Sequence, residues 1–192
     1  DQRLGLPAEP RQGESTAPLA FSAYTSTALK DRTASYLNCV SRLDTGIGLF
    51  LNMLEKNDAL DNTLIIFIGD HGPPFARSKA SSYDHGLRIP FIVYGPGVQA
   101  GAVSQQPVST IDILPTILAY TGARPLSGLP GESLLGYLDG SAPVQPDRPL
   151  FGSYAFHQRD AFYPMRAVRQ DDWLLIENLT PEGPRPRPAI DD

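Results

Sequence analysis

The chain has 192 residues, and 16 Lys and Arg stand against 21 Asp and Glu, which gives a formal net charge of −5. This length suffices for one domain with a sizeable core, and the mixed charges argue against a surface for nucleic acid or anionic membrane. No apolar run approaches the roughly 20 residues that span a bilayer, so no transmembrane segment is expected. The single cysteine, Cys39, excludes an internal disulfide and a multi-cysteine metal site.

The N-terminal part predicts an irregular segment over residues 1–24, rich in Pro, Gly, Glu and Arg, and then a long helix from Thr27 to Lys56. The helix is predicted because apolar residues recur at steps of three and four on one face: Tyr36, Val40, Leu43, Ile47, Phe50 and Leu54. Cys39 lies close to that face, so we expect a small buried core residue. No general base is placed near it by sequence, which disfavours a catalytic nucleophile.

The middle of the chain alternates strand and helix patterns. A continuous apolar run, Leu64–Ile68, predicts a strand buried on both faces, as in a parallel sheet. Further elements are predicted as a strand at 91–94, a helix at 109–120 with a capping box at Ser109 and Asp112 and a C-terminal cap at Gly122, and a short helix at 132–138. The alternation predicts an α/β layer with a mostly parallel sheet over residues 25–145.

After Pro143 the pattern changes to strands. Residues 150–154 predict one strand, and residues 165–169 and 173–177 predict a β-hairpin. Residues 146–180 are therefore predicted to form a small antiparallel subdomain. Residues 181–192 are rich in proline and predict an extended tail.

Asp70 and His71 are candidate metal ligands at the end of the first strand. Ligands of open α/β sheets bind beyond the carboxyl ends of strands, and this pair offers one carboxylate oxygen and one imidazole nitrogen. The sequence Asp70-His71-Gly72 also fits an ordinary turn after a strand. The pair does not complete a site, because calcium takes about six to eight oxygen ligands and zinc takes at least three from protein.

Two further residues are candidates for contact with a substrate. Lys79 lies on the loop that leaves the same strand end, where its ammonium could meet a sulfate or phosphate oxygen. A solvated surface lysine is the alternative. His157 follows a predicted strand and fits either a substrate contact or an ordinary loop histidine.

Taken together and in this order, the motifs resemble the sulfatases of the alkaline-phosphatase superfamily. The resemblance covers residues 25–180 and rests on five stretches of the sequence: 40–44 (VSRLD), 61–72 (DNTLIIFIGDHG), 83–93 (YDHGLRIPFIV), 108–118 (VSTIDILPTIL) and 131–135 (GESLL). The segment Tyr163 to Arg169 with its hairpin is most similar to the heparan N-sulfatase (sulfamidase) branch. The fold implied is part of an alkaline-phosphatase-like sulfatase sheet with flanking helices, followed by the start of an antiparallel C-terminal subdomain.

The resemblance implies hydrolysis of a sulfate ester or sulfamate, with a sulfated sugar as substrate. Asp70 and His71 match the pair that completes a divalent-cation site, usually calcium. Many sulfatases have Asn where His71 stands, and His is also the form in related phosphatases and phosphonate hydrolases. Lys79 matches the basic residue that binds the sulfate. His157 falls where sulfamidase-like sequences also have histidine, which implies a substrate-pocket role, whereas no role carries over to His85.

The nucleophile of sulfatases is a formylglycine made within a Cys/Ser-x-Pro-x-Arg motif, and this motif does not occur in the chain. In the family it precedes the stretch matched here, as does the Asp pair that begins the metal site. We therefore expect the chain to be the C-terminal part of a sulfatase and to be inactive alone, with the formylglycine outside it. A phosphodiesterase or phosphonate hydrolase of the same superfamily and a non-catalytic binding module remain alternatives. The family implies a periplasmic, secreted or lysosomal protein, and the oligomeric state is left open.

Overall fold

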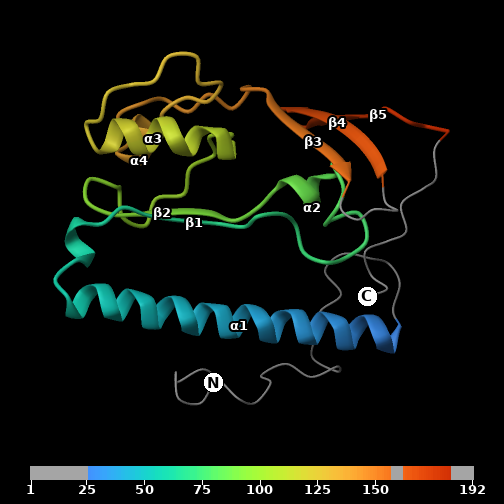
Figure 1. Cartoon of the computed structure of the whole chain (residues 1–192), viewed down its shortest axis with the longest axis horizontal. Coiled ribbons are helices and arrows are strands. Elements are labelled where there is room, and N and C mark those ends of the chain that lie inside the picture. The colour runs from blue at the N-terminus through green and yellow to red at the C-terminus, as the bar shows by residue number, and fades with distance from the viewer. Residues whose placement is uncertain (1–25, 157–161, 183–192) are drawn as a thin grey trace. The chain divides into compact units, whose positions relative to one another are not determined.

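The computed structural model describes residues 26–156 and 162–182, and Figure 1 traces them in colour. The chain divides into two compact units, residues 1–63 and 64–192. The predicted leading segment, His157 and all but the first two residues of the predicted tail lie outside the described residues. Among the described helices, none combines the length and apolar character that crossing a membrane requires.

The first unit contains the predicted long helix, α1, with the predicted bounds Thr27–Lys56. Ser26 caps it, because its Oγ accepts a hydrogen bond from the Leu29 N–H at 3.2 Å. A 3-10 helix, η2, follows at Leu60–Asn62.

The predicted burial along α1 is only partly observed. Thr33 and Ala34 are buried, whereas Leu43 of the apolar face is 54% exposed. Cys39 is exposed, so the prediction of a buried core residue is wrong. A periodic apolar stripe shows that a helix has a side to bury, but it does not supply the element that covers that side.

The second unit begins with a two-stranded sheet of β1, Ile65–Ile68, and β2, Phe91–Tyr94. The strands are antiparallel, with Ile65 opposite Tyr94 and Ile68 opposite Phe91. The prediction of a mostly parallel sheet is therefore wrong for the described residues, as is burial on both faces: Ile68 is 36% exposed and the other residues of β1 are half-buried. An apolar run indicates burial but carries no information on strand direction.

The direction is set by the connection between the two strands. Residues 69–90 contain only a one-turn helix, α2 at Asp84–Leu87, rather than a crossover helix. The Gly69 N–H donates to the Pro90 carbonyl at 3.2 Å, which extends the pairing one step beyond the strands.

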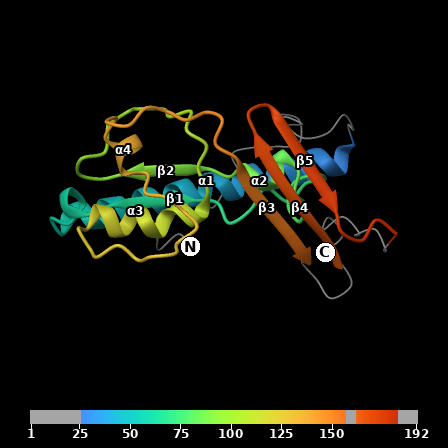
Figure 2. The same ribbon diagram turned by 90° about the horizontal axis from the view of Figure 1, so that it is seen from above.

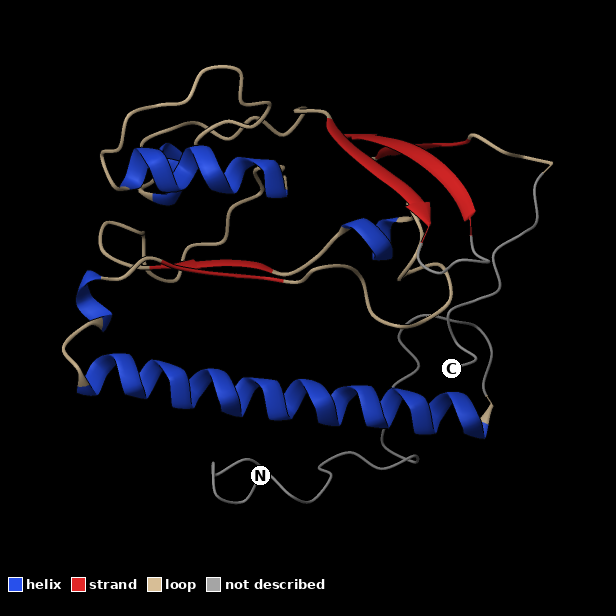
Figure 3. Ribbon diagram, in the orientation of Figure 1, coloured by secondary structure: helices blue, strands red, loops and turns tan. Residues whose placement is uncertain are grey.

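Two short helices follow in the second unit, and Figure 3 distinguishes them from the strands by colour. A 3-10 turn, η3 at Thr110–Asp112, runs into α3 at Ile113–Tyr120, and α4 follows at Leu135–Leu138. Gly122, with φ of 67°, ends α3 as predicted. The Tyr120 hydroxyl donates to the Pro96 carbonyl at 2.7 Å, which ties the end of α3 to the turn after β2.

The predicted C-terminal antiparallel element is confirmed as a sheet in the order β3-β4-β5, seen from above in Figure 2. The strands are Leu150–Phe156, Phe162–Gln170 and Trp173–Asn178. Asp171, with φ of 51°, lies in the tight turn between β4 and β5. One face carries the buried residues Met165 and Ala167, and the other carries exposed apolar side chains such as Phe151.

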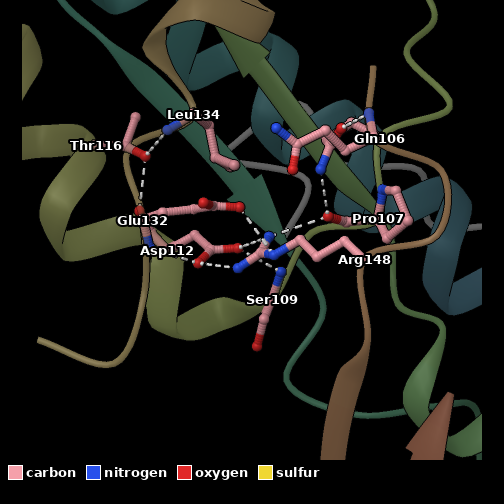
Figure 4. Close-up of polar contacts among 9 residues, drawn as sticks. Gln106, Pro107, Ser109, Asp112, Thr116, Glu132, Leu134 and Arg148 are labelled. Carbon is pink, nitrogen blue, oxygen red and sulfur yellow. Dashed lines mark hydrogen bonds and ion pairs between the residues drawn. The ribbon is translucent and has the colours of Figure 1, made fainter. Parts of the chain in front are cut away.

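A buried polar network joins segments of the second unit that are far apart in sequence (Figure 4). Asp112 has no exposed surface. Its carboxylate accepts hydrogen bonds from Arg148 Nη1 and Nη2, each at 2.8 Å, and from the N–H groups of Ser109 at 2.8 Å and Glu132 at 3.0 Å. The bond from Ser109 is the carboxylate half of the predicted capping box.

The guanidinium of Arg148 is the other centre of this network. Its Nε pairs with Glu132 Oε1 at 2.8 Å, and its Nη1 also donates to the Pro107 carbonyl at 3.0 Å. Burial alone would raise the pKa of Asp112, but the hydrogen bonds from Arg148 and from the two backbone N–H groups outweigh burial and hold that pKa below its usual value. Bonding to Asp112 raises the pKa of Arg148.

Thr116 and Gln106 connect the network to the segments around Leu134 and Gln145. The Thr116 hydroxyl donates to the Asp112 carbonyl at 2.6 Å and accepts from the Leu134 N–H at 2.9 Å. Gln106 Oε1 accepts from the Gln145 N–H at 2.7 Å. The residues before β3 are thereby fixed to the start of α3.

Candidate functional site

Asp70 and His71 follow β1 after a single residue, Gly69, and their side chains face each other. The His71 N–H donates to Asp70 Oδ1 at 3.0 Å, and His71 Nε2 lies 3.4 Å from Asp70 Oδ2. His71 Nδ1 lies 2.8 Å from the Gly72 carbonyl oxygen. Because a carbonyl oxygen can only accept, Nδ1 donates in this contact, and in the tautomer with its single ring proton on Nδ1 the lone pair is on Nε2, next to the carboxylate.

This arrangement fits one edge of a divalent-cation site. Two donors 3.4 Å apart that bind one ion at about 2.4 Å subtend about 90° at the ion, as adjacent calcium ligands do. At about 2.1 Å they subtend about 110°, the tetrahedral angle preferred by zinc. The Gly72 carbonyl fixes the ring as the outer partners of metal-bound histidines do.

The pair is only part of such a site within the described residues, where no group of three or more His, Cys, Asp or Glu is placed to hold a metal ion. The Asp70 side chain is 86% exposed and that of His71 is 41% exposed, so both are accessible to an ion. A bound ion would complete its ligand set with other donors, such as water, substrate oxygens, carbonyl oxygens or residues outside the described ranges.

The loop after His71 folds back on itself and returns the backbone of Lys79 to Pro73. The Lys79 N–H donates to the Pro73 carbonyl at 3.1 Å, two residues beyond His71. The Gly72 N–H donates to the Gly86 carbonyl at 3.3 Å, which closes the other side of the loop. Three of the four residues singled out from the sequence, Asp70, His71 and Lys79, thus belong to one folded loop at the end of β1.

The backbone around Lys79 is strained. Arg77, with φ of 60°, and Ala80, with φ of 61°, flank it in the left-handed region, which costs a non-glycine residue about 1 kcal/mol or more. Such strain persists only where surrounding contacts enforce it. Ser78 supplies one of them, because it is fully buried and its Oγ donates to the His85 carbonyl at 2.8 Å. In the described part of the chain the Lys79 ammonium forms no ion pair, so its charge is available to an anion.

Two glycines allow the loop to close so tightly. A Cβ on Gly72 would lie 1.8 Å from the His85 carbonyl oxygen, and one on Gly86 would lie 2.3 Å from the Ser81 carbonyl oxygen. Both distances are impossible without moving the backbone. The two glycines stand in the sequence, but the close approach at Gly72 depends on a residue 13 positions away, and the one at Gly86 on a residue five positions away in an irregular loop, so neither has a local signal.

Two other loop features were not predicted from the sequence. The Arg77 guanidinium lies over the Tyr83 ring, 4.5 Å from its centroid, a cation–π contact. His85, to which no role was carried over, contributes its backbone carbonyl as the acceptor for Ser78. His157 lies outside the described residues, so its predicted substrate contact stays a prediction.

Comparison with known proteins adds two family matches. The family described as Sulfatase matches residues 9–123, and the family described as N-sulphoglucosamine sulphohydrolase, C-terminal, matches residues 69–182. Among curated proteins, human N-sulphoglucosamine sulphohydrolase is 34% identical over 178 residues, which cover 86% of this chain and 34% of that protein. The chain thus spans about a third of the length of this relative.

Solved structures agree on the fold. A 2-O GAG sulfatase superposes with a TM-score of 0.67 at 23% identity, over 80% of this chain and 34% of the other. The phosphonate monoester hydrolase of Agrobacterium radiobacter superposes with a TM-score of 0.68 at 24% identity, over 81% of this chain and 34% of the other.

Proposed function

Because the chain belongs to the sulfatase family, with the alkaline-phosphatase-like fold of its structural neighbours, we propose that the protein it comes from hydrolyses sulfate esters or sulfamates on a sugar. The observation that carries the proposal is the pair of family matches, which together run through the Asp70–His71 strand end, the loop of Lys79 and the C-terminal sheet. The name of the human relative, N-sulphoglucosamine sulphohydrolase, supports a sulfamate on glucosamine as one substrate of this class.

The roles proposed for the candidate residues follow from their chemistry. The Asp70 carboxylate and His71 Nε2 hold a divalent cation, with calcium favoured by the family resemblance. When bound, the cation polarises an oxygen of the substrate's sulfate and stabilises charge as it develops. The Lys79 ammonium binds the same anionic group from the loop and offsets its charge during transfer. His157 is proposed as a substrate contact.

The nucleophile is proposed to be a formylglycine on a residue outside this chain, which would be the C-terminal part of a longer sulfatase. Two facts support this: the chain spans 34% of its human relative, and its sequence has no Cys/Ser-x-Pro-x-Arg motif. The chain alone is then expected to show no arylsulfatase or sulfamidase activity with calcium present. Turnover by the isolated chain would refute this assignment. A periplasmic, secreted or lysosomal location is proposed for the same protein.

The roles are tested in the full-length protein with a sulfate ester and with N-sulfoglucosamine as substrates. Lys79→Ala is expected to lower kcat/KM by about 100-fold, the usual cost of losing one group that stabilises transition-state charge. Lys79→Arg should retain part of the activity, because it keeps a cation. Lys56→Ala, at the exposed end of α1, is the matched control. If Lys79→Ala stays within about two-fold of the parent and of this control, Lys79 does not bind the reacting group.

A phosphonate or phosphate diester hydrolase is the second candidate. It is favoured by His71, which stands where many sulfatases have Asn, and by the structural likeness to a phosphonate monoester hydrolase. Offering a phosphonate monoester and the matching sulfate ester to the same full-length preparation separates the two. A higher kcat/KM for the phosphonate would replace the sulfatase proposal, and no turnover of either would favour a non-catalytic binding module.

A further inference from the structure

The C-terminal sheet contacts the loop of the candidate site through the one-turn helix α2. Arg169 of β4 donates from Nη1 to Asp84 Oδ1 at 2.5 Å, and Asp84 is the first residue of α2. At the other end of α2, Leu87 packs against Gly152 of β3, where an added Cβ would lie 2.8 Å from Leu87 Cδ2. The sheet therefore holds α2 at both of its ends.

Both contacts come from the same face of the sheet. Gly152 lies opposite Ala167, and Leu150 lies opposite Arg169. Because alternate residues of a strand share a face, Gly152, Ala167 and Arg169 all point to the side of α2. Ala167 is 6% exposed, which agrees with a face that is covered.

Helix α2 in turn holds both sides of the Lys79 loop through its backbone carbonyls. The His85 carbonyl accepts the Ser78 hydroxyl, and the Gly86 carbonyl accepts the Gly72 N–H. A single helical turn is not stable alone, because it fixes several residues for few hydrogen bonds. Its place, and with it the strained backbone beside Lys79, depends on what packs against it.

We propose that Arg169 is a positioning residue of the candidate site, which through Asp84 holds α2 and thereby the loop that presents Lys79. This inference rests on the proposed function in one respect only, namely that Lys79 is the group that binds the anion. The mechanical part, from Arg169 to the Gly72 and Ser78 anchors, stands on the contacts above whether or not Lys79 binds a sulfate. The C-terminal sheet then helps to fix the conformation of the loop that carries Lys79.

Amide hydrogen exchange of this chain tests the mechanical part. Arg169→Ala is expected to speed exchange at Gly72, Ser78 and Lys79 by about two- to five-fold, since the two partners are each 37% exposed and solvent weakens the pair. Asp84→Asn should give the same increase without altering the sheet. Arg169→Lys, which keeps a cation within reach, should restore slow exchange.

Arg166→Ala is the matched control, because Arg166 lies on the opposite face of the same strand, between Ser153 and Glu177. It should leave exchange at the three loop amides unchanged. The proposal is overturned if Arg169→Ala and Asp84→Asn leave the loop amides unchanged, or if Arg166→Ala speeds them equally.

Titration with inorganic sulfate, followed through the amide signal of Lys79, separates this inference from the proposed function. Binding by the parent chain that weakens in Arg169→Ala and returns in Arg169→Lys supports both. If sulfate shifts nothing in the parent chain while exchange still responds to Arg169, the assignment of Lys79 fails and the positioning role stands. If sulfate binds equally to the parent and to Arg169→Ala, Arg169 does not position Lys79.

Discussion

Replacing Asp112 by Ala should be among the most damaging single changes in the second unit. Asp112 is fully buried, and its carboxylate accepts four hydrogen bonds, two from Arg148 and one each from the N–H groups of Ser109 and Glu132. The variant leaves two backbone donors without an acceptor, at about 1 kcal/mol or more each. The variant also leaves the guanidinium of Arg148, whose side chain is only 15% exposed, without the Asp112 carboxylate.

Breaking a buried ion pair from one side costs about 3 to 5 kcal/mol. Arg148 keeps Glu132 and the Pro107 carbonyl in the variant, so the lower end applies. We expect Asp112→Ala to lose about 3 kcal/mol of unfolding free energy, a large share of the roughly 5 to 15 kcal/mol typical of a domain. Urea denaturation followed by far-UV circular dichroism measures this loss. The only tryptophan, Trp173, is 83% exposed and would report poorly.

Two further variants make the argument refutable. In Asp112→Ala with Arg148→Met the unpaired cation is gone, so the double variant should be more stable than the sum of the two single losses by about 1 kcal/mol or more. Asp139→Ala removes an exposed carboxylate whose bonds are local, to Ser141 and its own backbone, and it should cost less than about 1 kcal/mol. If Asp112→Ala costs no more than Asp139→Ala, the network does not organise this unit.

Three other outcomes are expected. Because the pKa of Asp112 is lowered in the folded chain, the ionised carboxylate contributes to the free energy of unfolding. This contribution is fully present above the pKa of an unfolded Asp, about 3.9, and is lost as the pH falls through the lower pKa of the folded state. Acid titration of the parent chain should show this loss of stability, and Asp112→Asn should not show it. Gly72→Ala should loosen the site loop, because the added Cβ would lie 1.8 Å from a backbone atom. Gly48→Ala, inside α1 and facing open space, should instead stabilise the chain by about 0.5–1 kcal/mol. Thermal melting and amide exchange compare the two variants. Calorimetry with calcium should show weak binding to this chain, because the described residues provide only a partial ligand set, and tight binding lost on Asp70→Ala would contradict a half-built site.

Local patterns predicted the elements well and their surroundings poorly. The bounds of α1, the cap at Gly122 and the β4–β5 hairpin were predictable because each depends on residues within a turn or two of chain. The antiparallel pairing of β1 and β2 and the exposure of Cys39 depend on distant partners, so the same patterns misassigned them.

The candidate site divides in the same way. Asp70, His71 and Lys79 were found from their place after a strand and from a family resemblance. The return of Lys79 to Pro73 and the tie from Arg169 to Asp84, which spans 85 positions, are invisible to any local pattern. The network around Asp112 could not be predicted either. A capping box indicates where a helix begins, but it does not indicate that Asp112 pairs with Arg148, 36 positions away.

The long separations within the Asp112 network have a consequence for the order of folding. Its longest-range bonds join residues 36 to 41 positions apart: Asp112 with Arg148, Gln106 with Gln145 and Pro107 with Arg148. Closing a segment of about 40 residues costs roughly 3 kcal/mol of chain entropy before any bond forms. The β4–β5 hairpin closes over two residues and pays far less. We therefore expect the hairpin to form early and the ion pair late, so that Asp112 is desolvated only when the chain is already nearly folded.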